Sequence, residues 1–486
     1  MYPLGKQFEV DYAKAVTNNK AIVQGRTFRI SVLTERVVRL EYSPSGQFVD
    51  RPTQLILRRN LGLADFSIRQ DSTTLEITTK YFSLNYTKEQ PFIGSSVSAT
   101  KNLKITLESR DKDRNKDWYF GHPEARNLKG NMISTDLSTN PNQAKGLYSL
   151  DGFVSIDDSK NKVILEDGTL ADPPVGHIDV YVFMYDKDFK QALTDYFKLT
   201  GSPSLIPRYA LGNWWSRNYE YNDKLVYDLI RNFERKRIPL SIMLFDNDWH
   251  YRSVGKDVGL KSGFTFNAQL FKDPKAMIEQ FHGRGIRVGL CINPDQGIYP
   301  HEFFYKQACA YLEKKDATII RFDPLNPKLL DILLKMFLHP LEAFGVDFFW
   351  NDSKDVTDIN KLWALNHYLY LDSKRDVAKR GMLLARNGLI APHRYGVLYG
   401  GSSEVSWESL RKMPFDYLNA SNIGVSWWSH DVAGNHGGIE DGELYVRYLQ
   451  LSTFHQFLDF MVLVVNIIKK NLGYGMRKQK IYLLTI

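Results

Sequence analysis

Beyond about residue 208 the chain alternates between short apolar runs and longer amphipathic runs, and this alternation restricts the possible folds more than any other feature. The apolar runs 240–245 and 286–292 are typical of buried strands, and residues 274–282 between them follow a helical period. Further apolar runs lie at 345–350, 381–385, 396–399 and 424–428. Repeated strand-then-helix units predict a parallel sheet of the α/β class, and this many units favour a closed (β/α)8 TIM barrel over an open sheet.

The first part of the chain has a different pattern. Between about residues 8 and 182, short segments such as 28–33 and 75–84 alternate apolar and polar side chains. This pattern predicts half-buried antiparallel strands. Glycine and proline in the segment 201–207 mark a domain boundary. We therefore expect an antiparallel β-sandwich domain in residues 1–200 and the barrel in residues 201–457.

Composition excludes several classes of protein. The chain has 486 residues, 43% of them hydrophobic, which is enough for a large core. The net charge of +8 comes from scattered lysines and arginines, without a basic stripe that carries aromatic residues, so we expect no nucleic-acid partner. The apolar run 457–468 is shorter than the roughly 20 residues that cross a bilayer, so we expect no membrane span. Two cysteines and no secretory signal predict a cytoplasmic protein.

Four apolar runs end in segments rich in acids and aromatic residues, at 246–250, 351–355, 399–404 and 427–431. In a TIM barrel the carboxyl ends of the strands surround one pocket. Carboxylates that bind hydroxyl groups, together with tryptophans that stack on a sugar ring, suit a carbohydrate substrate. A single aspartate after a strand can equally be a helix cap, but four convergent segments favour a sugar site.

Other chemistries lack comparable motifs. There is no phosphate-binding glycine loop, no His/Cys cluster at zinc spacing and no Gly-x-Ser-x-Gly nucleophile motif. We therefore expect neither a metal nor a cofactor. His250 and His430 are interpreted as structural histidines without a catalytic role.

Two segments of the chain, 205–216 and 420–431, resemble specific signatures of glycoside hydrolase family 31, which contains α-glucosidases and α-xylosidases. The resemblance extends from about residue 20 to about residue 457. It implies a retaining α-glycoside hydrolase of the α-glucosidase type, which acts on α-linked oligosaccharides through a covalent intermediate and needs no cofactor.

The resemblance also implies roles for individual residues. Asp352 matches the nucleophile of the family. Asp246 matches an acid that holds hydroxyls of the sugar, and Arg386 matches an arginine that contacts both that sugar and the nucleophile. Trp350 and Asp431 match further substrate-binding positions in the pocket.

One departure concerns the second carboxyl group that retaining hydrolysis requires. Ser402 occupies the usual acid/base position, and a serine hydroxyl is no general acid near neutral pH. Glu404 is a possible substitute acid, or it simply solvates the loop before the next helix. Two hypotheses follow: a working glycosidase, or a catalytically inactive carbohydrate-binding remnant or decayed-gene product.

The other departure is the tail, residues 458–486. Its amino acids can be encoded by codons that, read from their third base, spell a peptide similar to the Arg-x-His segment of the family. We therefore expect that a frameshift near residue 458 truncates the family-like part and leaves the barrel without its normal last strand.

Overall fold

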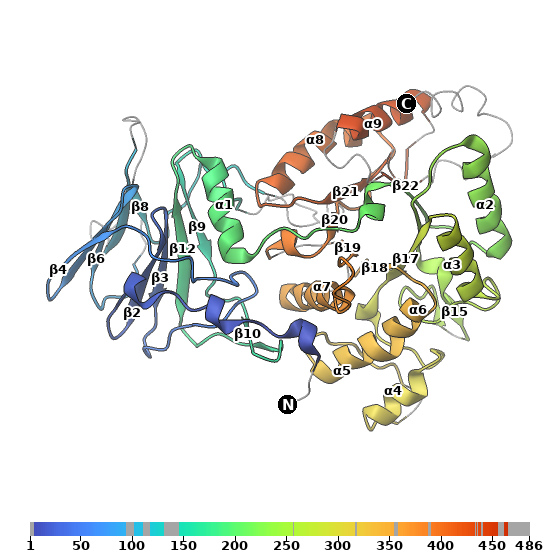
Figure 1. Cartoon of the computed structure of the whole chain (residues 1–486), viewed down its shortest axis with the longest axis horizontal. Helices are drawn as coiled ribbons and strands as arrows, with labels where there is room; N and C mark the ends of the chain where they lie inside the picture. Colours follow the sequence, from blue (N-terminus) through green and yellow to red (C-terminus); the bar gives the residue numbers. More distant parts are fainter. Residues whose placement is uncertain are drawn as a thin grey trace.

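The structure is a computed structural model that describes most of the chain. The described residues are 4–93, 102–109, 117–130, 145–255, 257–315, 318–353, 358–386, 390–432, 434, 436–438, 441–454 and 461–464. Two antiparallel sheets lie at one end of the molecule and a barrel of parallel strands lies at the other (Figure 1).

The predicted β-sandwich consists of two five-stranded antiparallel sheets. One has the order β1 (Ile22–Gln24), β2 (Phe28–Thr34), β3 (Val37–Tyr42), β12 (Ile178–Met184) and β9 (Phe153–Asp157). The other runs through β4 (Ser67–Gln70), β5 (Thr74–Thr78), β6 (Phe82–Thr87), β7 (Leu103–Leu107) and β8 (Asp117–Tyr119). Alternate residues of both sheets form one buried core, which is the arrangement that a period of two predicts.

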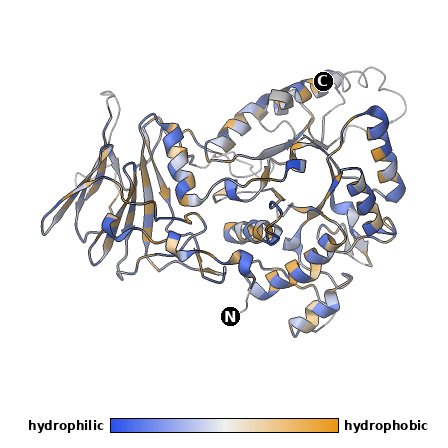
Figure 2. Cartoon of the chain, in the orientation of Figure 1, coloured by the Kyte–Doolittle hydropathy of each residue, from blue (hydrophilic) through white to orange (hydrophobic). Residues whose placement is uncertain are grey.

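The predicted barrel is also confirmed. Its parallel strands are β13 (Asn213–Arg217), β14 (Ile242–Phe245), β17 (Arg287–Ile292), β18 (Phe348–Asn351), β19 (Leu383–Ala385), β20 (Val397–Tyr399), β21 (Trp428–Asp431) and β22 (Met461–Val464). The helices of this part are α2 (Asp223–Lys236), α3 (Pro274–Gly283), α4 (Tyr305–Tyr311), α5 (Pro327–Asp331), α6 (His339–Ala343), α7 (Ile359–Ser373), α8 (Trp407–Ser421) and α9 (Gly442–Phe454). Hydrophilic residues cover much of α2 at the rim of the barrel (Figure 2), while its Val226 and Ile230 are buried.

The last strand of the barrel comes from the unusual tail, in place of a normal last strand. Seven strands, β13 to β21, form most of the ring, and the eighth place is taken by β22, which belongs to the unusual tail. This strand pairs in parallel with β13 and with β21, so the ring of hydrogen bonds is closed. The physical reason is that a short apolar run rich in β-branched residues satisfies two open strand edges whatever its origin. Residues 458–460 and 465–486 lie outside the described residues, and the frameshift stays a prediction.

Large apolar side chains from different strands fill the barrel interior. Trp214, Leu244, Phe348 and Leu384 belong to this buried cluster. Gly289 on β17 leaves room for it, because a Cβ atom at this position would come within 2.4 Å of the Phe348 ring. The filled interior forms the floor beneath the carboxyl ends of the strands.

Helix α1 (Phe189–Thr200) lies between the sandwich and the barrel (Figure 1). The Arg394 guanidinium donates a hydrogen bond of 3.0 Å to the Thr200 carbonyl and another to the Gln54 carbonyl, and the ring of His393 is 2.9 Å from the Gly201 carbonyl. These contacts join the two parts through buried polar groups. No helix in the described part of the chain has the length and apolar character of a membrane span.

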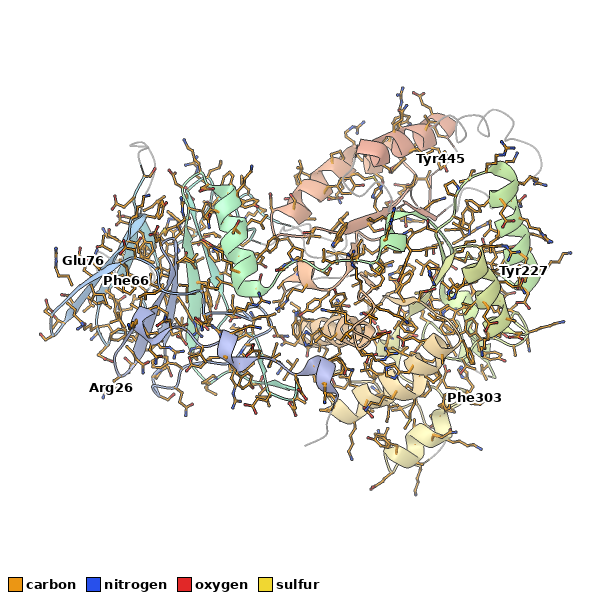
Figure 3. All side chains as sticks on the ribbon, viewed as in Figure 1. Arg26, Phe66, Glu76, Tyr227, Phe303 and Tyr445 are labelled. Atoms are coloured by element: carbon orange, nitrogen blue, oxygen red, sulfur yellow. The ribbon has the colours of Figure 1, made fainter. Side chains whose placement is uncertain are left out.

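The sandwich contains a buried ion-pair network that gives a stability prediction. Arg39 is fully buried, contacts Asp179 at 2.8 and 2.6 Å and lies 3.0 Å from Glu41. Replacing Arg39 by alanine removes the cation that contacts the buried Asp179, while Glu41 keeps its 2.6 Å pair with Arg29. We expect a loss of about 3–5 kcal/mol in the free energy of unfolding. Arg69→Ala is the matched control, because Arg69 is exposed and forms a 3.4 Å pair with Glu76 on the outer side of the second sheet (Figure 3). Urea unfolding measures both variants, and equal losses contradict the prediction.

Candidate active site

Asp246 is the first polar residue after β14. Its side chain accepts hydrogen bonds from the backbone N and from Nδ2 of Asn247, at 2.7 and 2.8 Å, so it caps a short 3-10 helix, Asn247–Trp249. Burial raises the pKa of Asp246 to about 6, and the negative charges of Asp352 and Asp248 act in the same direction. The carboxylate is therefore ionised above about pH 6. Since the folded-state pKa is above the usual value for aspartate, this group lowers the stability of the fold as the pH rises from about 4 to 6.

Asp352 and Arg386 come together from neighbouring strands. Asn351 on β18 pairs with Ala385 on β19, and the next residue on each strand is Asp352 and Arg386. Both side chains are buried, and Nε of Arg386 donates a short hydrogen bond to Oδ1 of Asp352. A guanidinium at this distance favours the ionised form of a carboxyl group. The structure thus joins the two residues that the resemblance assigned to one sugar.

Tyr399, the last residue of β20, connects three of the predicted site residues. Its hydroxyl donates a 2.7 Å hydrogen bond to Oδ2 of Asp431, which is buried at the end of β21. The guanidinium carbon of Arg386 lies 5.1 Å from the centre of the Tyr399 ring, and the Trp350 ring packs edge-on at 5.3 Å. Burial keeps the pKa of the Tyr399 hydroxyl well above its usual value, so it remains a proton donor in this hydrogen bond.

Ser402 and Glu404 lie in the loop that follows β20. Ser402 is partly buried, whereas Glu404 is exposed. The backbone of Glu404 forms an isolated parallel bridge with His436, and its side chain lies against Gly437. The structure therefore places both residues beside the barrel mouth, with the Glu404 side chain along the 436–438 turn.

The two histidines that the sequence analysis left out have structural partners. The ring nitrogens of His250 lie 3.0 and 3.2 Å from the carbonyls of Tyr251 and Lys261, and burial lowers its pKa to about 4. His430, a residue of β21, lies 2.9 Å from the hydroxyl of Tyr417, a residue of α8.

Sequence reasoning gave no individual role to three polar residues of the site. Asn247 and Tyr399 lie within the segments 246–250 and 399–404 that it expected at the pocket, and Asn293 lies outside them. Tyr399 could have been found from the inward period of β20, because it is two residues after the buried Val397. Asn247 and Asn293 are hydrogen-bonded to each other across 46 positions of sequence, and no local pattern indicates such a pair.

A group of possible metal ligands and a cavity lie elsewhere in the described part of the chain. Among the described residues, Glu41, His177 and Asp179 have ligand atoms within 4.8 Å of one another. Arg39 already pairs with both carboxylates, and its positive charge opposes a bound cation. A cavity of about 600 Å³ lies at the opposite end of the barrel, where Asp347 precedes β18, and so it is separate from the carboxylates described above.

The arrangement brings three carboxylates and one guanidinium to the carboxyl ends of the barrel strands. Strands β14 and β18 are the two neighbours of β17 in the ring, so Asp246 and Asp352, the partner of Arg386, follow strands on either side of β17. A carboxylate that accepts a hydrogen bond from a guanidinium, as Asp352 does, is suited to attack an electrophilic carbon. The others are suited to hold hydroxyl groups.

Comparison with known proteins identifies the family of the barrel. Residues 203–460, more than half of the chain, match the Glycosyl hydrolases family 31 TIM-barrel domain. An alpha-xylosidase of Saccharolobus solfataricus is 27% identical over 384 residues, which cover 72% of this chain and 47% of that protein. The lysosomal alpha-glucosidase of Mus musculus is 23% identical over 508 residues, which cover 89% of this chain and 51% of that protein. The chain thus spans about half the length of these curated relatives.

Solved structures share the fold. The Flavobacterium johnsoniae GH31 dextranase complexed with glucose has a TM-score of 0.64 at 16% identity, over 94% of this chain and 65% of that chain. A GH31 alpha-xylosidase from a soil metagenome, complexed with xylose, has a TM-score of 0.65 at 16% identity, over 89% and 76% of the two chains. The family domain covers the strands that carry Asp246, Asp352, Arg386 and Asp431. The chain therefore belongs to glycosyl hydrolase family 31.

Proposed function

We propose that this protein is a retaining α-glycoside hydrolase of the α-glucosidase type that acts on α-linked oligosaccharides. The observation that carries the proposal is the buried Asp352–Arg386 pair at the mouth of a family 31 barrel, next to Asp246 and Asp431. Relatives named alpha-xylosidase and alpha-glucosidase support this class of substrate, and they leave glucose and xylose as the two sugars to compare.

The proposed mechanism has two steps. In the first, an Oδ atom of Asp352 forms an ester bond to the anomeric carbon while the bond to the leaving oxygen breaks. In the second, water attacks the same carbon and loses a proton to the solvent, the ester bond breaks to restore the Asp352 carboxylate, and the sugar is released with retained configuration. Arg386 donates a hydrogen bond to Asp352 and holds it in place, and Asp246 holds hydroxyls of the sugar.

The first step also requires a proton donor for an oxygen that leaves as an alkoxide. With Ser402 at the usual acid/base position, a good leaving group reacts through Asp352, whereas an alkoxide leaving group lacks a proton donor. This observation favours a second candidate function, a catalytically inactive carbohydrate-binding remnant.

An activated substrate separates the two functions. We expect 4-nitrophenyl α-glucoside, whose leaving group needs little acid assistance, to leave a glycosyl adduct on the peptide that contains Asp352. Mass spectrometry of the digested protein detects this adduct, and 4-nitrophenyl α-xyloside tests the alternative sugar. Sugar binding without an adduct favours the remnant. If the protein shows no sugar binding and forms no adduct, both functions are refuted.

A further inference from the structure

Three polar side chains form a hydrogen-bonded row from the end of β17 to the end of β14. Nδ2 of Asn293 donates to Oδ1 of Asn247 at 2.8 Å, and Nδ2 of Asn247 donates to Oδ1 of Asp246 at 2.8 Å. Asn293 and Asn247 are only 2% and 8% exposed, so water does not replace these contacts. The carboxylate of Asp246 is therefore held by a buried amide that is itself held by a second buried amide.

A backbone carbonyl determines the direction of this row. Nδ2 of Asn293 also lies 3.2 Å from the carbonyl oxygen of Lys261, which can only accept a hydrogen bond. The NH2 group of Asn293 must therefore face Lys261 and Asn247. As a consequence Asn247 directs its oxygen toward Asn293 and its NH2 group toward Asp246. If both amides were reversed, the oxygen of Asn293 would face the Lys261 carbonyl and the oxygen of Asn247 would face the Asp246 carboxylate, so two acceptors would oppose each other at each of these contacts.

The row leaves one oxygen of Asp246 available. Asn247 gives two donors to Oδ1, its backbone N and Nδ2, and no hydrogen bond from the described residues reaches Oδ2. The charged groups around this carboxylate are Asp352 and Asp248, which disfavour its charge, and Arg252, which favours it. Oδ2 is thus the atom that can accept a hydrogen bond from a hydroxyl group in the pocket.

We propose that Asn293 is a positioning residue for sugar binding, which acts through Asn247 to orient the carboxylate of Asp246. This inference rests on the proposed function in one respect, namely that Asp246 holds a sugar hydroxyl. Asn293 itself is buried, with its amide against Asn247 and the Lys261 carbonyl, and it needs no contact with the sugar.

The isosteric variant Asn293→Asp tests the direction of the row. An ionised carboxylate at position 293 only accepts hydrogen bonds, so it repels the Lys261 carbonyl and forces the Asn247 amide to turn its oxygen toward Asp246. We expect the Kd for 4-nitrophenyl α-glucoside to rise by about 10- to 100-fold at pH 7, the range for a lost hydrogen bond to a charged group. Asp246 itself titrates near pH 6 in both proteins, so the Kd of the variant is compared with that of the wild-type protein at each pH. Protonation of the new carboxyl group restores a donor, so the ratio of the two Kd values should fall toward 1 as the pH falls toward 5, which a merely structural defect does not do.

Asn419→Asp is the matched control. Asn419 is also a buried asparagine whose Nδ2 donates to a backbone carbonyl, that of Phe415 at 2.8 Å, but it lies on α8 outside the row. This variant should leave both the Kd and its pH dependence unchanged. An unchanged Kd in Asn293→Asp, with the wild-type protein binding the glycoside, overturns the inference and leaves the proposed function intact.

A second measurement does not depend on the sugar. In a double-mutant cycle of Asn293→Asp and Asp246→Asn, the effect of the first change on the unfolding equilibrium constant should be about 3- to 100-fold smaller once the Asp246 carboxylate is absent. Additive effects show that the two positions do not communicate, and they refute the positioning role. If the wild-type protein fails to bind any glycoside while the cycle shows coupling, the proposed function fails and the hydrogen-bonded row stands.

Discussion

Asp352→Asn is expected to abolish the glycosyl adduct and to lower the release of nitrophenolate from 4-nitrophenyl α-glucoside on the order of 10⁶-fold, as in other hydrolases that lose their nucleophile. The amide cannot form the ester intermediate, and it lacks the negative charge that stabilises an oxocarbenium-like transition state. Intact-protein mass spectrometry measures the adduct, and absorbance measures the nitrophenolate. An adduct that persists in this variant contradicts the assignment of the nucleophile.

Stability needs a control in this experiment, because Asp352→Asn leaves the guanidinium of Arg386, only 3% exposed, without its carboxylate. Removing one partner of a buried ion pair costs about 3–5 kcal/mol. The double variant Asp352→Asn with Arg386→Met removes both charges, and we expect it to regain stability but no adduct. Asp248→Asn, a change at another strand end where the acid pairs with Arg252 at 3.0 Å, should keep the adduct.

Ser402→Asp is expected to raise the hydrolysis of unactivated α-glucosides by about 10²–10⁴-fold, the usual contribution of general acid–base catalysis. A carboxyl group about 5–5.5 Å from the nucleophile protonates the leaving oxygen and later activates water. Maltose, whose leaving group is an alkoxide, should gain far more than 4-nitrophenyl α-glucoside. The comparison of the two rates is therefore the measurement.

Ser403→Asp is the control for this gain, since it adds the same charge to the same loop one residue later. An equal gain in both variants would mean that added charge, and not a placed acid, is responsible. Glu404→Gln should leave turnover unchanged, because Glu404 is exposed and its side chain lies against Gly437. A loss in that variant would identify Glu404 as the substitute acid.

Much of the fold could be predicted from local pattern. The apolar runs at 240–245, 286–292 and 345–350 contain the strands Ile242–Phe245, Arg287–Ile292 and Phe348–Asn351. These predictions succeeded because a buried parallel strand needs a continuous apolar run, which is visible in any short window. The strand that closes the ring was harder to predict. The tail was interpreted from its departure from the family, and pattern alone did not predict that Met461–Val464 pairs with β13 and β21.

The sequence by itself determined which residues stand at strand ends. Asp246 directly follows β14, Asp352 directly follows β18, and Asp431 is the last residue of β21. Each acid therefore marks the point where an apolar run changes to polar residues. The barrel topology brings these strand ends to one mouth. Only the tertiary structure decided which atoms meet. Asp352 pairs with Arg386 across 34 positions, and the Asn293–Asn247 row has a direction set by a carbonyl elsewhere in the chain. The physical reason is that strand formation depends on neighbours in sequence, whereas donors, acceptors and charges are satisfied by whichever groups the closed barrel places within about 3 Å.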